Sequence, residues 1–236
     1  MRLDLAIAAR FPDISRRKAR ELIAQKRVLV NERRVAVASR EVADADRIAI
    51  VDEGAAIPIL ASSDDWIAIN KPAGIPTQPP RDRKVRSAEE LLRVEHGEIY
   101  LVHRLDTPTS GVVLFARTRA AAARFSELFA SGAMRKVYLA VADGVIDEQQ
   151  RIESPIEGRE AATIIRPLRR AGDRTVVEAE ILTGRTHQIR IHLASIGHPV
   201  AGDRRYGGSR ASRLMLHAWK LEHPSIGTLE APPPFV

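Results

Sequence analysis

The chain reads His103-Arg104-Leu105-Asp106-Thr107-Pro108-Thr109-Ser110-Gly111, and then continues directly into the apolar run Val112-Val113-Leu114-Phe115. The first stretch has the composition of a turn, and the run after it predicts a buried strand. An acid on a turn beside a buried strand can be held rigidly at the edge of a cleft, where a nucleophile or general base belongs. A simpler interpretation is a turn in which Asp106 binds its own backbone and Arg104 neutralises its charge. The stretch alone leaves both interpretations open.

Segments with the two-residue period of strands lie on both sides of this stretch, and helical segments separate them. Strands are predicted at 66–69, 137–141 and 176–181, and helices at 88–94, at 119–131 and at 187–195. Thr118 and Thr186 are the expected N-caps of the last two helices, and Gly132 and Gly197 their expected ends. This pattern predicts an α+β fold with a large mixed, mostly antiparallel sheet flanked by helices.

The first fifty residues predict a separate, small α/β unit. Leu3, Ile7 and Phe11 recur at helical spacing, and Ser15 is the expected N-cap of a second helix whose arginines project outward. Three short strands are then predicted at 28–30, 35–37 and 46–50, with a turn at 31–34. A linker at 53–56 follows, so we expect one domain at 1–55 and a second at 60–236.

The overall composition is that of a folded protein in a reducing compartment. Of the 236 residues, 44% are hydrophobic, which suffices for a core, and no apolar run is long enough to cross a bilayer. Arg2 and Asp4 interrupt the apolar N-terminus, so it does not resemble a signal peptide. The chain has no cysteine, which excludes disulfides and thiolate metal sites. We therefore expect a cytoplasmic protein without a membrane partner.

Positive charge is concentrated near the N-terminus. The formal net charge is +7, and residues 10–34 hold nine lysines and arginines against three acids. Such a run is either a solvated face or a surface that binds phosphates.

Five strings occur in one order along the second predicted domain, and together they resemble the RluA family of RNA pseudouridine synthases. The strings are Asn70-Lys71-Pro72-Ala73-Gly74; His103 to Gly111; Arg135-Lys136-Val137-Tyr138-Leu139-Ala140; Thr183-Gly184-Arg185-Thr186-His187-Gln188-Ile189-Arg190-Ile191-His192-Leu193; and Gly197-His198-Pro199-Val200-Ala201-Gly202-Asp203 with Tyr206-Gly207. The N-terminal unit resembles the S4 RNA-binding module, most closely in Val28-Leu29-Val30-Asn31. The resemblance implies RNA as partner, with candidate contacts at Arg16, Arg17, Arg20, Lys26 and Arg27.

The resemblance also implies a reaction, the conversion of uridine in RNA to pseudouridine, which is redox-neutral and uses no metal or cofactor. The sequence agrees, because it contains no GxGxxG, no phosphate loop and no histidine pair at i, i+4. His187 and His192 are five positions apart, so on a helix they point about 140° away from each other. A shared metal is therefore not expected.

Site residues follow from matching the strings. Asp106 matches the catalytic acid, which adds to the sugar, adds to the base or stabilises a glycal-like intermediate, and the sequence leaves these three open. Arg190 matches the arginine that pairs with this acid, and Tyr138 the active-site tyrosine. Arg104 matches the residue that enters the RNA stack when the target nucleotide flips out. Three further assignments are an apolar wall under the base from Leu216, with Leu214 nearly as good a candidate, loop orientation by His103, and structural roles for Asp203 and Tyr206.

Two departures and several alternatives remain. Pro108 stiffens the loop after the acid. Thr77-Gln78 replace the usual valine and histidine in the loop after Asn70–Gly74, so the resemblance gives no support for a contact from this second loop.

Large-subunit ribosomal RNA is the expected substrate of a monomeric enzyme. The alternatives are the same reaction on tRNA, a non-catalytic RNA-binding or ribosome-assembly protein, and a nucleoside-cleaving hydrolase. The hydrolase would require a second carboxylate or a metal, and no second acid lies in a comparable string.

Overall fold

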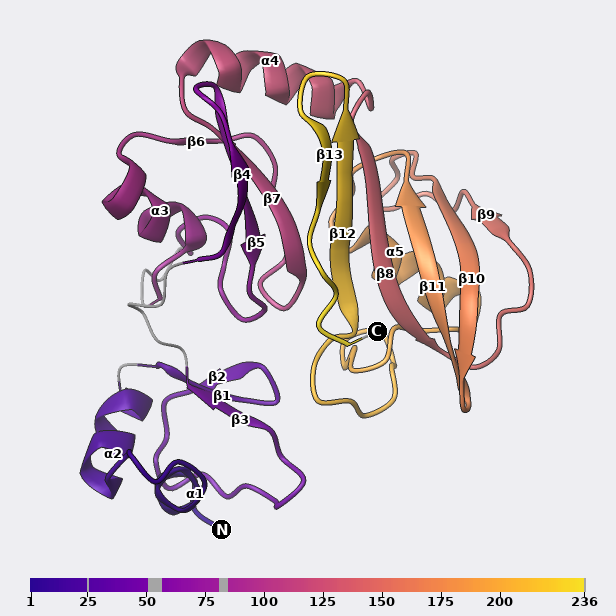
Figure 1. Ribbon diagram of the computed structural model, residues 1–236. Coiled ribbons are helices and arrows are strands. Elements are labelled where there is room, and N and C mark those ends of the chain that lie inside the picture. The colour runs from indigo at the N-terminus through magenta and orange to yellow at the C-terminus, as the bar shows by residue number, and fades with distance from the viewer. Residues whose placement is uncertain (25, 51–56, 81–84, 236) are drawn as a thin grey trace.

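A small N-terminal unit and a larger C-terminal unit make up the computed structural model (Figure 1). The structure describes residues 1–24, 26–50, 57–80 and 85–235. We refer to residues 1–50 as the N-terminal unit and to residues 57–235 as the C-terminal unit. The predicted linker at 53–56, with the predicted domain boundary, lies outside the described residues.

The described residues of the N-terminal unit form two helices and a small sheet, as predicted, and the sheet is antiparallel with the order β2-β1-β3. The elements of the unit are α1 (Leu3–Arg10), α2 (Arg16–Ala24), β1 (Val28–Val30), β2 (Arg33–Val35) and β3 (Ile48–Ile50). The Ser15 hydroxyl accepts a hydrogen bond from the Lys18 amide at 3.2 Å, which caps α2 at the predicted residue. Ala19, Leu22 and Ile23 point from α2 into a core shared with α1 and the sheet.

The β1–β2 hairpin is tighter than predicted. Asn31 and Glu32 both have positive φ, 49° and 61°, and β2 therefore begins at Arg33 instead of Val35. Two central residues with positive φ make a turn whose twist matches that of the strands, and asparagine tolerates this conformation well. The four-residue turn was a wrong prediction, and the correction places Glu32 at the tip of the hairpin.

The C-terminal unit is built on one large sheet of order β4-β5-β7-β12-β8-β11-β10-β9, with β6 beside β7 and β13 beside β12. Among the described strands only the β7–β12 pair is parallel, which confirms the predicted mixed, mostly antiparallel sheet. The strands are β4 (Ile59–Ser62), β5 (Trp66–Lys71), β6 (Tyr100–Leu101), β7 (Ser110–Ala116), β8 (Arg135–Asp143), β9 (Gln150–Ile152), β10 (Thr163–Ala171), β11 (Arg174–Ile181), β12 (Leu216–His223) and β13 (Gly227–Glu230).

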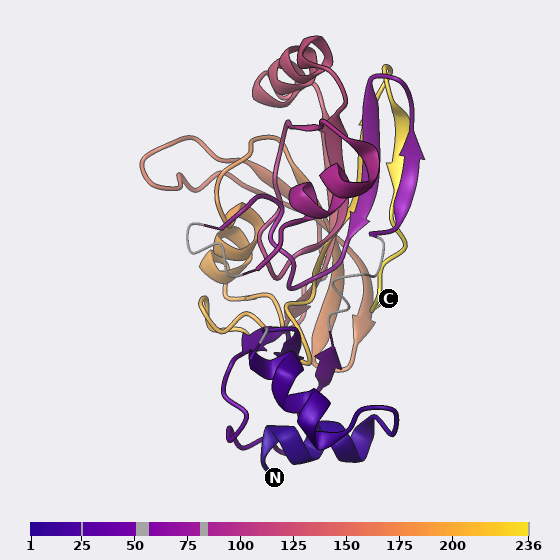
Figure 2. The same ribbon diagram turned by 90° about the vertical axis from the view of Figure 1, so that its left-hand side faces the viewer.

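Three helices cover the two faces of this sheet, and α5 lies behind it in Figure 1 (Figures 1 and 2). They are α3 (Ala88–His96), α4 (Arg119–Ala130) and α5 (Gln188–Ser195). Along β7, Val113 and Phe115 pack in the α3 cluster, whereas Val112 and Leu114 pack in the α4 cluster. The run is continuously apolar because both faces of β7 are buried. None of the helices in the described ranges is long and apolar enough to cross a membrane.

Gly111 allows β7 and β12 to start side by side. Its φ is 117°, and a Cβ atom there would collide with the main chain of Ala218. Ser110 and Gly111 pair with His217 and Ala218, and this is the parallel junction of the sheet. The loop of Asp106 therefore ends at the line where the two halves of the sheet meet.

Of the two N-caps predicted in the C-terminal unit, one is confirmed and one is wrong. The Thr118 hydroxyl accepts from the Ala121 amide at 3.1 Å, as expected. Thr186 does not cap α5, because His187 occupies the N-cap position in a left-handed conformation. The Gln188 side chain instead accepts the Arg185 amide at 3.0 Å and so organises the turn before the helix.

Candidate active site

A cleft of about 540 Å³ opens on the sheet face that carries α3 and α5. Tyr138 packs against the apolar clusters of both helices, so it lies between them. All six residues that the sequence nominated for catalysis or substrate contact line this cleft: His103, Arg104, Asp106, Tyr138, Arg190 and Leu216. Segments far apart in the sequence therefore meet here, while the role of each residue remains a prediction.

The loop that carries Asp106 is held by its own backbone and by β5. The Thr109 amide donates to the Asp106 carbonyl at 3.0 Å, which closes a turn after the acid. The Thr107 carbonyl accepts from the Gly74 amide at 2.7 Å and from Lys71 Nζ at 3.4 Å. Asp106 therefore projects from a loop in which the following residue, Thr107, is held in place by hydrogen bonds to its carbonyl.

Lys71 is a buried residue beside the Asp106 loop, and sequence reasoning left it without a role. It is fully buried, and its ammonium also donates to the Pro72 and Ile75 carbonyls at 3.0 and 2.8 Å. Burial lowers the pKa of Lys71 to about 7, and the nearby charge of Arg213 acts in the same direction. The sequence signal that could have pointed to Lys71 is its position at the end of β5, a largely apolar strand.

Two cationic or titratable groups approach the Asp106 carboxylate. Arg190 Nη1 and His187 Nε2 each lie 3.5 Å from Asp106 Oδ2. Arg190 is buried, so it is not the helix-surface arginine of the simpler interpretation. Its Nε and Nη2 atoms donate to Asp203 at 2.6 and 2.8 Å. Burial disfavours the charge of Arg190, but the bonds to Asp203 and the two carboxylates raise its pKa overall.

His187 is a second residue that the sequence left unassigned. Its Nδ1 atom lies 2.9 Å from the Tyr206 hydroxyl, while Nε2 faces Asp106. Burial lowers the pKa of His187, Asp106 opposes this shift, and Arg190 adds to it. The imidazole is therefore predominantly neutral at pH 7, so one of its ring nitrogens can donate a hydrogen bond while the other accepts one.

Tyr138 and Leu216 form the floor of the cleft on adjacent strands. Tyr138 pairs with Ala218, and Leu216 pairs with Ala140, in the β8–β12 register. Burial raises the pKa of Tyr138, and the nearby Asp106 carboxylate raises it further. The phenol is therefore protonated at neutral pH, and its ring and the Leu216 side chain present an apolar surface to the cleft.

His103 and Arg104 occupy different environments although they are neighbours. The Leu114 amide donates to His103 Nε2 at 2.9 Å, and the His103 ring stacks on Phe129 at 4.2 Å. Burial lowers the pKa of His103 to about 3, so the ring is a neutral anchor of the loop. Arg104 is exposed at the mouth of the cleft.

The loop with the unusual residues Thr77 and Gln78 does contact the site. The Thr77 hydroxyl donates to the Leu105 carbonyl at 2.8 Å and accepts from the Leu105 amide at 3.1 Å. Thr77, which departs from the family pattern, therefore holds the backbone of Leu105, the residue before Asp106.

The five candidate RNA contacts of the N-terminal unit lie away from the cleft. Arg16 and Arg20 project from α2, but their Nε atoms also bind the buried Asp4 carboxylate at 3.0 and 2.9 Å. Burial opposes the charge of Asp4, yet these bonds and Arg2 hold its pKa well below its usual range. Arg17 is exposed, and Lys26 and Arg27 are partly buried.

Within the residues that the structure describes, no three histidines, cysteines, aspartates or glutamates gather as a metal site. His192, which the sequence considered together with His187, is buried against Thr163 Oγ1 at 2.8 Å and the Ser154 carbonyl at 2.9 Å.

Comparisons with known proteins agree with this architecture. Residues 65–195 match the family model described as RNA pseudouridylate synthase, and residues 1–48 match that of the S4 domain. An uncharacterised RNA pseudouridine synthase of Bacillus subtilis is 36% identical over 79% of this chain and 72% of its own length. The ribosomal large subunit pseudouridine synthase D of Nitrosomonas europaea is 31% identical over 97% of this chain and 79% of its own. The solved structure of the human RNA pseudouridylate synthase domain containing 1 is 30% identical, with a TM-score of 0.65 over 76% of this chain and 84% of its own.

Proposed function

This chain belongs to the RNA pseudouridylate synthase family, and we propose that its substrate is the RNA of the large ribosomal subunit. The enzyme isomerises uridine in RNA to pseudouridine. The ribosomal target is supported by the likeness to the large-subunit synthase of Nitrosomonas europaea, which extends over almost the whole chain. Transfer RNA is the alternative.

The observation that carries the catalytic proposal is the Asp106 carboxylate facing a cleft beside Arg190, with Tyr138 on its floor. We assign Asp106 as the catalytic aspartate, and Arg190 as the cation that pairs with its carboxylate and orients it. The protonated Tyr138 stacks on the flipped uracil and offers its hydroxyl for proton transfer. Arg104, at the mouth, fills the space that the flipped nucleotide leaves, His103 holds the loop, and Leu216 backs the base.

The rest of the proposal concerns the whole enzyme. The isomerisation changes no oxidation state, so acid, base and nucleophilic side chains suffice, and we assign no metal or cofactor. Residues 1–55 form an S4 domain that adds phosphate-directed affinity through Arg16, Arg17, Arg20, Lys26 and Arg27, and residues 60–236 form the catalytic domain. The enzyme acts as a monomer, and a ribosomal substrate implies a cytoplasmic location.

The test is the incubation of purified protein with unmodified large-subunit rRNA and, separately, with bulk tRNA, followed by pseudouridine mapping. We expect pseudouridine in the rRNA, and its loss in Asp106→Asn, which keeps the shape of the side chain but removes the charge. The loss should be at least about 1,000-fold in kcat, as for the removal of an activated nucleophile.

Each rival has its own outcome. Modification of tRNA alone would transfer the substrate assignment to tRNA, and free uracil would indicate a hydrolase. RNA binding without any product would indicate a non-catalytic protein. Full activity in Asp106→Asn would refute the catalytic assignment.

A further inference from the structure

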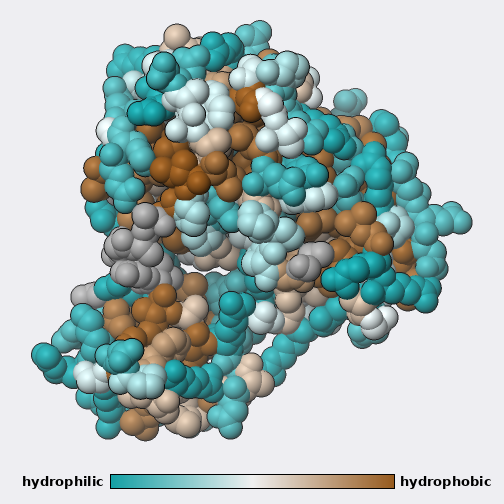
Figure 3. Space-filling model, in the orientation of Figure 1, coloured by the Kyte–Doolittle hydropathy of each residue, from teal (hydrophilic) through white to brown (hydrophobic). Residues whose placement is uncertain are grey.

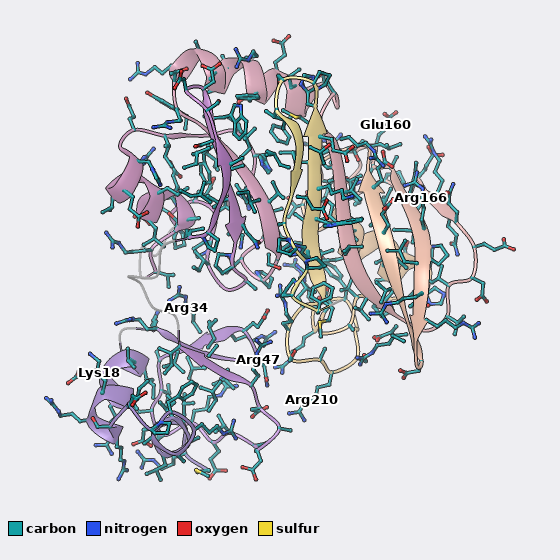
Figure 4. The ribbon with its side chains drawn as sticks, viewed as in Figure 1. Lys18, Arg34, Arg47, Glu160, Arg166 and Arg210 are labelled. Carbon is teal, nitrogen blue, oxygen red and sulfur yellow. The ribbon has the colours of Figure 1, made fainter. Side chains whose placement is uncertain are left out.

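The hairpin tip of the N-terminal unit contacts the C-terminal unit close to the loop of Asp106, because Asn31 and Glu32 line one pocket together with Thr107. Figure 3 shows the two units joined along a narrow seam, and Figure 4 shows Arg34 and Arg47 on the side of the N-terminal unit that faces this seam. Glu32 is partly buried in the seam, and its Oε1 atom lies 3.2 Å from Arg213 Nε. Arg213 is itself buried in the segment before β12.

Glu32 occupies an unfavourable position, which calls for a reason. Its Oε2 atom is buried and has no hydrogen-bond partner among the described residues. Its backbone is left-handed, a conformation that glutamate rarely adopts. A buried, incompletely satisfied carboxylate costs stability, and such groups persist mainly where function requires them.

One line of contacts leads from Glu32 to the residue that ends the catalytic loop. Arg213 Nη2 donates to the Ser110 hydroxyl at 2.6 Å, and this hydroxyl also lies 2.8 Å from His217 Nδ1. Ser110 is four residues after Asp106 and begins β7 at the parallel junction. The Glu32 carboxylate therefore orients the guanidinium that fixes this end of the loop.

A second line leads from the same hairpin to the residue after Asp106. Arg34 Nε donates to the Gly74 carbonyl at 3.4 Å, and the side chain of Leu29 packs on Gly74 so closely that a Cβ there would require it to move. The Gly74 amide in turn donates to the Thr107 carbonyl at 2.7 Å. Both ends of the loop are thus braced from the N-terminal unit.

We propose that Glu32 is a positioning residue for the reaction, and that its ion pair with Arg213 makes the N-terminal hairpin part of the framework that aims Asp106. This inference rests on the proposed catalytic role of Asp106. The N-terminal unit then has a second task besides RNA affinity, because turnover depends on its hairpin even when RNA is bound.

The experiment measures kcat and KM of the full-length enzyme on the RNA that it modifies, under multiple and single turnover. In Glu32→Gln we expect kcat to fall about 10- to 100-fold, because a small misplacement of a catalytic group has an effect of this size, while KM stays within about twofold. Glu32→Asp keeps the charge and tolerates the left-handed backbone, so its kcat should lie between those of wild type and Glu32→Gln. Glu41→Gln, the same change at an exposed site of the same unit, should leave both constants unchanged.

An unchanged kcat in Glu32→Gln would overturn the proposal, and so would a rise in KM alone, which would mean that Glu32 serves RNA binding. Circular dichroism and thermal unfolding establish that each variant is folded. Should Glu32→Gln unfold, the comparison of Glu32→Asp with wild type decides, because a kcat equal to wild type would then refute the requirement for the placed charge. Asp106→Asn is measured in parallel, and full activity there would refute the proposed catalytic role of Asp106 instead.

Discussion

Arg190 joins two carboxylates that have different tasks. Two of its nitrogens are bound to the buried Asp203, and the third, Nη1, faces Asp106 in the cleft. The bidentate pair fixes the plane of the guanidinium, so the position of Nη1 relative to Asp106 is set by Asp203. Asp203 thus acts on the Asp106 carboxylate through Arg190 without lining the cleft itself.

Arg190→Lys should therefore be a damaging substitution although it conserves charge. A lysine ammonium is a point charge without the planar fork, and it cannot serve both carboxylates in this geometry. We expect kcat to fall about 100-fold, as for a misplaced catalytic group. Arg93→Lys, on the surface of α3 and paired with Glu89, is the matched control and should retain full activity. Equal kcat values in the two variants would contradict this account.

At the scale of elements, the parallel junction of β7 and β12 is the point on which the cleft depends. Gly111 at this junction has a positive φ and contacts the main chain of β12. The strands on one side of the junction carry the Asp106 loop, and those on the other carry Tyr138 and Leu216. Any separation of β7 from β12 would widen the cleft between them.

Gly111→Ala should accordingly destabilise the protein by about 3 kcal/mol, which combines backbone strain with overpacking. The control is Gly172→Ala, because Gly172 also has a positive φ, 66°, but a Cβ there would meet no atom within 4 Å. For this control we expect only the strain, about 1 kcal/mol. Urea unfolding of both variants measures the difference, and equal losses would show that contact with β12 does not matter.

Local sequence patterns predicted the elements well where one short segment determines them. Ser15 and Thr118 were identified as caps because their hydroxyls bind amides only three residues ahead. The prediction of Thr186 as the N-cap of α5 was wrong, because the left-handed His187 occupies that position and contacts Asp106 and Tyr206, which are distant in sequence. Lys71 and Glu32 were missed for the same reason, since their partners come from other segments. The cleft residues were predicted from motifs that resemble the family, and such motifs carry information about contacts between segments that are far apart in the sequence.

At the scale of the whole molecule, charges buried between the two units should make its stability depend on pH. Burial raises the pKa of Glu32 to about 7, against its ordinary value of 4.5, and Arg213, Arg47 and Lys71 oppose this only in part. The folded state thus binds the proton of Glu32 more tightly than the unfolded state. The resulting stabilisation is complete below pH 4.5 and is lost as the pH rises through 7.

Glu32→Gln should therefore gain stability relative to wild type between pH 4.5 and pH 8, by on the order of 3 kcal/mol. The difference between the two proteins is the relevant quantity, because the titration of His103 is common to both and cancels. Thermal unfolding at pH 5 and pH 8 measures it, with Glu41→Gln, the same change at an exposed site, as the control. A difference that shrinks with rising pH would have the wrong sign for a buried, costly carboxylate.

The order of strands has a consequence for biosynthesis. β12 is the last long strand to be made, yet it lies between β7 and β8 in the middle of the sheet. Until the ribosome has released the segment from Arg213 to His223, the earlier strands remain two separate, unsealed halves with exposed edges. The Asp106 loop then has neither its Arg213 brace nor the Leu216 wall, so we expect the cleft to form only after β12 has inserted between β7 and β8.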